Sequence, residues 1–473
     1  MLRTRSIILL ALAMLAVLPG LAAGHAVLLS SEPPAEARLA TSPPELRLQF
    51  NEPIQLVAPT DFDVVDETGL PVASEPGTVA PDDASALRIP LRPGLEPGTY
   101  TARYKIIGAD SHVITGVLVF RVGPGPLAEP FLAGAASAGG PSETSAWSVS
   151  ARFIELLMLG GLAGLLAFRW LVWRPAWSDL GDGVPDRLAA LTWGRDVFWI
   201  GFGVLALGAM LAEGYLLVVQ SATILGTSVG DAAADVPGLS SVLSETRFGS
   251  LVQVRAALLF VLFALGAWQF HREYGGGDSS KEPSVAGRAL PTAALVGILV
   301  VVLWQLSAQG HASQAPLPLL QTGLNLVHLV AVAVWVAGLA LVGLALWRLP
   351  RAAPGGGRAV ATAVLARFSR LALIVVAVAV ATGVGRAVGQ LDDPAQLWET
   401  AYGRSILIKV ALLCPIAAIS LRNRRVVTSL RRLKRPNAAG LGMVRRAATA
   451  ELALSLTIVL VASLLVAQVP GRV

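Results

Sequence analysis

The sequence predicts a protein in two parts: an all-β domain of the Greek-key sandwich or barrel type, followed by an all-α bundle of eight membrane helices. Three observations lead to this prediction. Only 14% of the residues are charged, against roughly 25% in soluble globular proteins. The first part, to about residue 122, has mixed polarity and many Pro and Gly, whereas long Ala, Leu and Val runs dominate from Trp147 onwards. The net charge is +6, and the basic residues concentrate in alternate loops of the apolar part.

Residues 1–24 have the organisation of a secretory signal peptide. Two arginines and an apolar run are followed by the small residues Ala22 and Gly24, three and one positions before a cleavage point. Cleavage there makes His25 the first residue of the mature chain, with a free α-amino group beside its imidazole. These nitrogens can chelate one metal ion, and imidazole suits copper, zinc and nickel. The alternative is that cleavage falls elsewhere and His25 is an ordinary polar residue.

Residues 25–122 are expected to form the β domain. Short segments in which polar and apolar residues alternate predict half-buried strands. Turn signals such as 67–69 and 96–98 separate them, and this spacing is typical of a Greek-key sandwich or barrel. Residues 123–148 are rich in Gly, Ala, Ser and Pro, and we expect them to be a flexible linker.

A second candidate metal-binding motif joins the last two predicted strands. Asp110 and His112 are two positions apart, so both side chains point to one side of an extended backbone. His112 is the other histidine of this domain besides His25. Together with the α-amine, these residues supply three nitrogens and one oxygen, and tetragonal N,O ligation is the preference of Cu(II). The alternative is an ordinary surface turn.

Residues 149–470 are expected to be the membrane domain. Each predicted helix is close to the roughly 20 residues that span a bilayer. An even number of helices returns the C-terminus to the side of the secreted β domain. The loops on the opposite side hold most of the Lys and Arg residues, as expected for cytoplasmic loops. The eight predicted helices lie near 149–173, 196–220, 250–271, 290–309, 323–347, 368–388, 404–422 and 447–467.

Several ionisable residues fall towards the outer ends of these helices, where lipid penalises them unless they pair or face a cavity. We expect the carboxylates and cations among them to form interhelical ion pairs and hydrogen bonds. For the two histidines we expect metal contact, because only the short loop 313–322 separates their helices; the alternative is a structural role. His271, at the inner end of the third helix, is expected to be an interfacial anchor. The outer residues are Glu155, Glu213, Arg255, Lys409, His311 and His328.

The membrane domain also contains an internal repeat. The segment 246–249, followed by an apolar helix with Arg255, recurs as 400–403, followed by a helix with Lys409. Such repeats are common in transporters. They also arise from simple duplication of a helical bundle, so the repeat favours transport only modestly.

The β half resembles the CopC family of periplasmic copper-binding domains. The resemblance rests on HAVLLSSEPPAEARLATSPPELRLQFNEPI from His25 and PGTYTARYKIIGADSHVITGVLVFRV at 97–122. It implies a cupredoxin- or immunoglobulin-like sandwich that binds Cu(II) through His25, Asp110 and His112, with Glu52 as a partner beside the ligands. Some relatives add a methionine-rich Cu(I) site, but this chain has no methionine between residues 14 and 158.

The membrane half resembles the CopD family of inner-membrane copper proteins. The motifs that carry the resemblance are GHAS (310–313), HLVAVAVWVAGL (328–339), ARFSRLAL (366–373) and YGRSILIKVALL (402–413). The resemblance implies a multi-pass protein of the bacterial inner membrane, with the β domain and the C-terminus on the periplasmic side. The family is linked both to copper uptake and to copper tolerance, so the direction of movement stays open.

We therefore expect a fused CopC–CopD protein that is not an enzyme. The β domain captures Cu(II) and delivers it to the bundle, which imports copper, with Cu(I) as a candidate form inside the bundle. The expected partners are copper, the lipid bilayer and periplasmic copper chaperones. The chain has no phosphate-binding loop motif, and we expect neither ATP nor nucleic acid. Two alternatives remain: copper tolerance, sequestration or sensing without transport, and a haem or copper membrane oxidoreductase.

Overall fold

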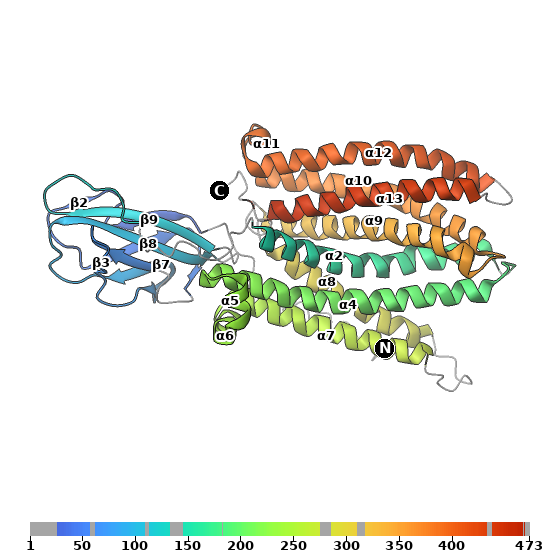
Figure 1. Ribbon diagram of the computed structural model, residues 1–473, viewed down its shortest axis with the longest axis horizontal. Helices are drawn as coiled ribbons and strands as arrows, with labels where there is room; N and C mark the ends of the chain where they lie inside the picture. Colours follow the sequence, from blue (N-terminus) through green and yellow to red (C-terminus); the bar gives the residue numbers. More distant parts are fainter. Residues whose placement is uncertain are drawn as a thin grey trace.

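The fold combines a β sandwich with a bundle of long helices. The computed structural model describes residues 26–56, 62–108, 113–132, 145–181, 183–274, 285–309, 317–432, 438–466 and 468. Figure 1 shows the sandwich at one end of the bundle, with the helix axes running away from it. We call this end of the bundle the β-domain end and the opposite one the far end.

The β domain is built from two sheets. The first has the strand order β1–β3–β7–β6, and the second has the order β2–β9–β8–β4, with β5 also paired to β8. Strand pairs are antiparallel except β2–β9, which is parallel. The bounds are β1 Leu28–Glu32, β2 Arg38–Leu39, β3 Glu45–Phe50, β4 Ile54–Gln55, β5 Phe62–Val65, β6 Thr78–Ala80, β7 Asp83–Pro90, β8 Gly98–Gly108 and β9 Val113–Val122.

Alternating apolar residues place the core between these two sheets. In β3, Leu46, Leu48 and Phe50 are buried while the intervening residues are half-buried. They pack in one cluster with Leu118 and Phe120 of the second sheet. This is the pattern of two sheets that face each other across a common core, and it confirms the predicted sandwich.

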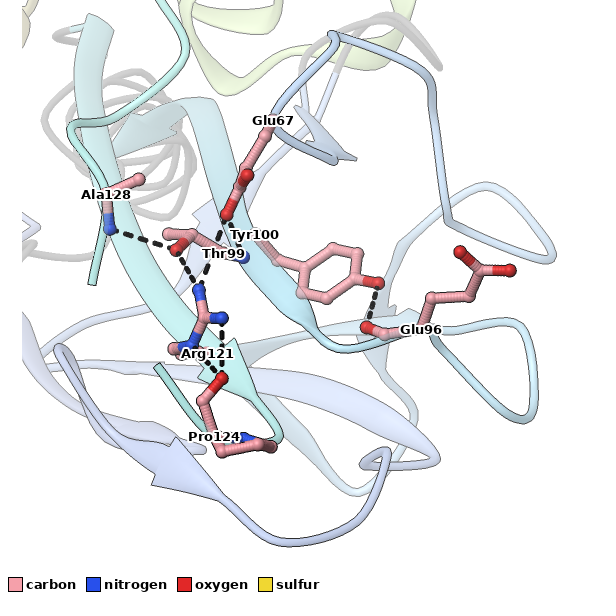
Figure 2. Close-up of polar contacts among 7 residues, drawn as sticks. All are labelled: Glu67, Glu96, Thr99, Tyr100, Arg121, Pro124 and Ala128. Atoms are coloured by element: carbon pink, nitrogen blue, oxygen red, sulfur yellow. Dashed lines mark hydrogen bonds and ion pairs between the residues drawn. The ribbon is translucent and has the colours of Figure 1, made fainter. Parts of the chain in front are cut away.

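The segment that follows β9 is held on the β domain by hydrogen bonds (Figure 2). The Arg121 guanidinium donates to the carbonyl of Pro124 at 2.7 Å and to the Thr99 hydroxyl at 3.2 Å. Further along, the backbone N–H of Ala128 donates to the same Thr99 hydroxyl at 3.0 Å. The backbone N–H of Phe131 donates to the Thr101 hydroxyl at 2.9 Å. The first part of the predicted linker 123–148 therefore lies on the β domain as far as Phe131. Residues 133–144 fall outside the described residues, and residues 146–148 belong to a helix.

Eight long helices form the described part of the bundle, which confirms the predicted fold class. Seven are long and apolar enough to cross a membrane, and the eighth, α8, has a shorter apolar stretch over Thr292–Ala308. The long helices are α2 Ala146–Phe168, which continues through the π-helical turn η1 Arg169–Trp173 into α3 Arg174–Leu180, α4 Arg187–Leu225, α7 Arg247–Tyr274, α8 Val285–Ala308, α9 Pro318–Ala352, α10 Gly357–Gln390, α12 Ala401–Arg432 and α13 Ala438–Val466. Short helices α5 Val229–Ala234, α6 Val236–Glu245 and α11 Gln396–Glu399 lie between them.

Helix α9 is the central helix of the bundle. Half of its most apolar stretch is buried, compared with 11% for α10 and α12, whose outer faces are left for lipid. Helix α2 approaches α9 closely at Gly164, where a Cβ would lie 2.4 Å from the carbonyl oxygen of Ala333. Small residues at such crossings let two helix backbones touch, and this contact drives helix association within lipid.

The β domain is docked on the bundle through the end of the β8–β9 hairpin. Ile107 of β8 is buried in one apolar cluster with Leu216 of α4 and Phe248 of α7. The backbone N–H of Arg247, the first residue of α7, donates to the Gln55 side chain at 3.0 Å. In Figure 1, helix α5 lies beside this end of the sandwich. The β domain therefore contacts α4 and α7 through a defined interface, which we call its seat.

We predict that this seat can be captured by a disulfide. In a Cys414→Ser background, which removes the one native cysteine, Gln55→Cys combined with Arg247→Cys should cross-link rapidly on mild oxidation. The control pair replaces Gln55→Cys with Glu96→Cys, which lies beyond the other end of β8, about 30 Å away at 3.3 Å per residue. Cross-linking is read by gel mobility after cleavage of the segment between the two halves. Equal cross-linking of both pairs would mean that the β domain has no fixed contact with α7.

Candidate functional site

The residues that flank the predicted copper ligands meet at the docked end of the β domain. The N–H of Val27 donates to the Asn51 side chain at 2.7 Å, and the N–H of Asn51 donates back to the Val27 carbonyl at 3.1 Å. The strand that follows Asn51 pairs Ile54 with Gly108, the last residue of β8. The chain next to residue 25, the turn after β3 and the end of β8 are thus held together by hydrogen bonds.

Of the predicted β-domain site, Glu52 is the residue that the structure places. Its side chain is buried, with 1% of its surface exposed, directly after Asn51. His25, Asp110 and His112 lie outside the described residues, so their joint ligation of copper stays a prediction. The nearest described residues before Asp110 and after His25 are Gly108 and Ala26, and both are buried.

The bundle contains a buried ion-pair network centred on Arg255 of α7. This arginine is fully buried, and its Nε and Nη2 donate to the same carboxylate oxygen of Glu213 on α4, at 3.0 and 2.8 Å. Its Nη1 donates to Gln309, just after α8, at 2.6 Å. Glu155 of α2 lies 3.6 Å from Nη2 and accepts a 3.2 Å hydrogen bond from Arg152. The network therefore joins four helices, and it brings together three of the four predicted intramembrane charges.

The fourth predicted charge, Lys409 of α12, lies in a different environment. It lines a cavity of about 490 Å³ that extends from the β-domain end to about the middle of the bundle. His328 of α9 and Arg386 of α10 lie on the same cavity, while Arg152 and Glu155 connect it to the Arg255 network. We expected an ion pair for Lys409, and no carboxylate pairs with it among the described residues.

The hydrogen bonds of His328 fix which ring nitrogen carries the proton. Nδ1 lies 2.9 Å from the carbonyl oxygen of Ala379 and 3.2 Å from the Thr382 hydroxyl. A carbonyl can only accept, so Nδ1 carries the proton and Nε2 carries the lone pair. Metal-binding histidines are commonly oriented in this way, through a hydrogen bond from the other ring nitrogen to a backbone carbonyl. A single metal ion could therefore bind at Nε2.

The second predicted membrane ligand, His311, lies outside the described residues. The chain enters that segment at Gln309, which lines the same cavity as His328. His271 is exposed and lies three residues before the last residue of α7, at the far end and away from the cavity. Within the described ranges, no group of three or more His, Cys, Asp or Glu side chains is arranged to hold a metal ion.

The structure also reveals residues that the sequence analysis missed. Arg386, Gln390 and Tyr402 all line the cavity, and the Tyr402 hydroxyl donates to the Gln390 side chain. Two of the three carried a signal in the sequence. Arg386 is a lone charge within the apolar run of a predicted membrane helix, and Tyr402 belongs to the second copy of the repeat.

The two copies of the repeat share the same local geometry. In each, a threonine hydroxyl accepts the N–H of the glycine three residues later: Thr246 from Gly249 and Thr400 from Gly403, both at 2.9 Å. This is the capping hydrogen bond of a helix N-terminus. A cation follows at the same spacing in both helices, Arg255 in one and Lys409 in the other, so these two residues are structural counterparts.

We predict that the Arg255 network is needed for stability. Arg255→Gln leaves the buried Glu213 carboxylate without its described cation and Glu155 with Arg152 alone, and breaking a buried pair in this way costs about 3–5 kcal/mol. Glu213→Gln should cost a similar amount, and the double substitution should cost clearly less than the sum of the two. The measurement is the thermal midpoint of the purified protein in lipid discs. Arg404→Gln is the matched control, because that arginine is exposed and its guanidinium donates, among the described residues, to backbone carbonyls near the helix start. Additive losses would show that the two side chains act independently.

Three family matches cover most of the chain. Residues 28–123 match the CopC domain, 143–316 match the copper resistance protein D-like N-terminal domain, and 362–465 match copper resistance protein D. The copper transport protein CutJ of Bacillus subtilis (strain 168) is 26% identical over 402 residues, which cover 84% of this chain and 67% of CutJ. Protein YobA of Escherichia coli (strain K12) is 30% identical over 101 residues, 21% of this chain and 78% of YobA.

Two solved structures also align with the β domain. CopC from Methylosinus trichosporium OB3b is 25% identical with a TM-score of 0.19, covering 22% of this chain and all of that one. PcoC, a methionine-rich copper resistance protein from Escherichia coli, is 27% identical with a TM-score of 0.18, covering 21% of this chain and 99% of that one. With an N-terminal CopC domain and a multi-helix membrane half that matches the copper resistance protein D families on both sides of α9, the chain belongs to the CopC–CopD fusion proteins.

Proposed function

We propose that this protein captures Cu(II) at the docked end of its β domain and passes copper into the bundle cavity for import across the inner membrane. The proposal rests on the contact between the β domain and helices α4 and α7. The end of the sandwich that gathers the flanks of the predicted ligands is the end that rests on α4 and α7. The polar part of the cavity lies at the same end of the bundle.

The comparison with CutJ supports transport rather than storage alone. CutJ is called a copper transport protein, and the match of 402 residues runs through both halves of this chain. In the arrangement proposed here, the β domain and the C-terminal end of α13 face the periplasm. The basic loops of the far end face the cytoplasm, in agreement with the positive-inside rule.

The proposed route runs by ligand exchange from His25, Asp110 and His112 to His328, with His311 as a second candidate on the bundle. His328 suits this role because its Nε2 lone pair is available while Nδ1 is held by Ala379. Fusion makes the transfer intramolecular, and effective concentrations of mM order are typical even of flexible tethers. A docked domain needs only a local movement, and the protein then acts as a carrier rather than an enzyme.

We predict that Cu(II) capture depends on the free α-amine of His25. A mature chain that begins at His25 should bind one Cu(II) tightly, and an added alanine before His25 should weaken binding more than about 100-fold. The loss of a direct ligand should exceed the 10–100-fold typical of a partner beside the ligands, and Glu52→Gln serves as that comparison. Binding is measured by chelator competition. It should also weaken as the pH falls, because the ligands must lose protons before they bind. Equal affinity of the native and extended chains would exclude the N-terminal chelate.

We predict that His328→Ala abolishes copper accumulation by cells while Cu(II) binding at the β domain stays unchanged. His311→Ala should behave in the same way if both histidines receive the metal. His271→Ala is the matched control, since it removes a histidine at the far end, and it should have little effect. Copper is measured in washed cells that express equal amounts of each variant. Normal accumulation in the His311/His328 double variant would leave these histidines as packing residues.

A further inference from the structure

The wall of the cavity formed by α10 and α12 carries more positive charge than its surroundings neutralise. Arg386 and Lys409 both line the cavity. The Nε of Arg386 is buried without a hydrogen-bond partner among the described residues. Neither side chain forms an ion pair within the part of the chain that the structure describes. A guanidinium does not lose its proton in proteins, so at least one full positive charge at membrane depth has no counter-charge among the described residues.

The other charged side chains beside the cavity already form ion pairs with one another. Arg255 is paired with Glu213 and Glu155, and Arg152 is paired with Glu155. Two carboxylates thus face two arginines across α2, α4 and α7. Within the described residues, the cavity and its network are left with two further cations, both on the opposite wall.

Comparison of the two copies of the internal repeat shows where the negative charge is missing. Arg255 and Lys409 are counterparts at the same spacing after Thr246 and Thr400. The first has a carboxylate on the preceding long helix, Glu213 of α4. The second has a cation there, Arg386 of α10, which acts on both Lys409 and His328 electrostatically. The first copy therefore contains a buried cation with its carboxylate. The second contains the corresponding cation, but the described part of the chain supplies no anion for it.

We propose that Arg386 and Lys409 bind an oxyanion of the phosphate class, taken from the headgroup of an anionic phospholipid or from a small soluble anion. A planar guanidinium fits two oxygens of such a group at once, and charge-assisted hydrogen bonds of this kind are among the strongest in proteins. The cavity volume of about 490 Å³ lies in the range of small-molecule sites. Its remaining lining is largely apolar, with Leu329, Leu456 and Leu465 among the lining residues, so it can also receive the first carbons of an acyl chain.

The experiment uses the full chain purified into lipid discs of phosphatidylcholine, alone or mixed with phosphatidylglycerol, with and without inorganic phosphate. Sodium chloride at equal ionic strength gives the baseline. A ligand that binds only the folded state raises the thermal midpoint, and we expect a rise of at least about 3 °C. If the source is lipid, phosphatidylglycerol gives the rise; if it is a soluble anion, phosphate gives it in phosphatidylcholine alone. Either result supports the site.

Arg386→Gln and Lys409→Gln should each reduce this rise, and the double variant should lose it. Arg404→Gln, an exposed cation at the start of α12, should keep it. In phosphatidylcholine without phosphate, Arg386→Gln should raise the midpoint, because it removes an unbalanced charge. That second measurement also shows that the variant folds. The proposal is overturned if neither anion stabilises the native protein, or if the double variant is stabilised as much as the native chain. Neither result depends on copper.

Discussion

A charge buried in the bilayer must have its partner inside the protein, and the Arg255 network shows how much structure follows from that constraint. Arg255 donates hydrogen bonds to Glu213 and Gln309 and forms an ion pair with Glu155. It thereby sets the relative positions of four helices at the β-domain end. Phe248 and Arg247 lie two turns before it on the same helix, and these residues hold the β domain. The ion pair within the membrane and the seat of the domain outside it are consecutive features of α7.

The constraint also divides the bundle into two electrostatic halves. On one side of the cavity, each arginine has a carboxylate within reach, and the side chains lock helices together. On the other side, His328, Arg386 and Lys409 share a wall without a described carboxylate. A copper ion at His328 would be repelled by both cations, and a bound anion would cancel that repulsion. If copper passes here, cation and anion are expected to favour each other's binding.

The sequence predicted the parts of the fold that depend on local pattern. Alternation in β3 and the apolar runs of the bundle identified the sandwich and all eight helices. A strand buried on one face alternates polar and apolar residues, and a membrane helix is a long apolar run, so both can be recognised in the sequence. It placed Glu155, Glu213 and Arg255 near the same membrane face, but it could not state their pairing, because that depends on which helices become neighbours. The ion pair expected for Lys409 is not found among the described residues, and its partner could not be named from the sequence for the same reason.

Composition was a weaker guide than pattern. The Gly, Ala, Ser and Pro content of 123–148 indicated a flexible linker, yet its first residues are tied to Thr99 and Thr101 on the β domain. Those bonds join backbone N–H groups to hydroxyls, and almost any sequence can form them. The linear pattern does not distinguish Arg386 from a cation that reaches the membrane interface by snorkelling. Its place on the cavity emerges only from the packing of α9, α10 and α12.

The seat of the β domain bears on how the two halves could exist apart. Ile107 is almost completely covered because α4 and α7 lie against it, and Val113 packs on the same cluster. A sandwich released from its bundle would present these side chains to water at the tip where the metal is expected to enter. Its solubility would then depend on covering that tip, by self-association or by another protein. In this chain the membrane half provides the cover, acting towards its own domain as a permanent binding partner.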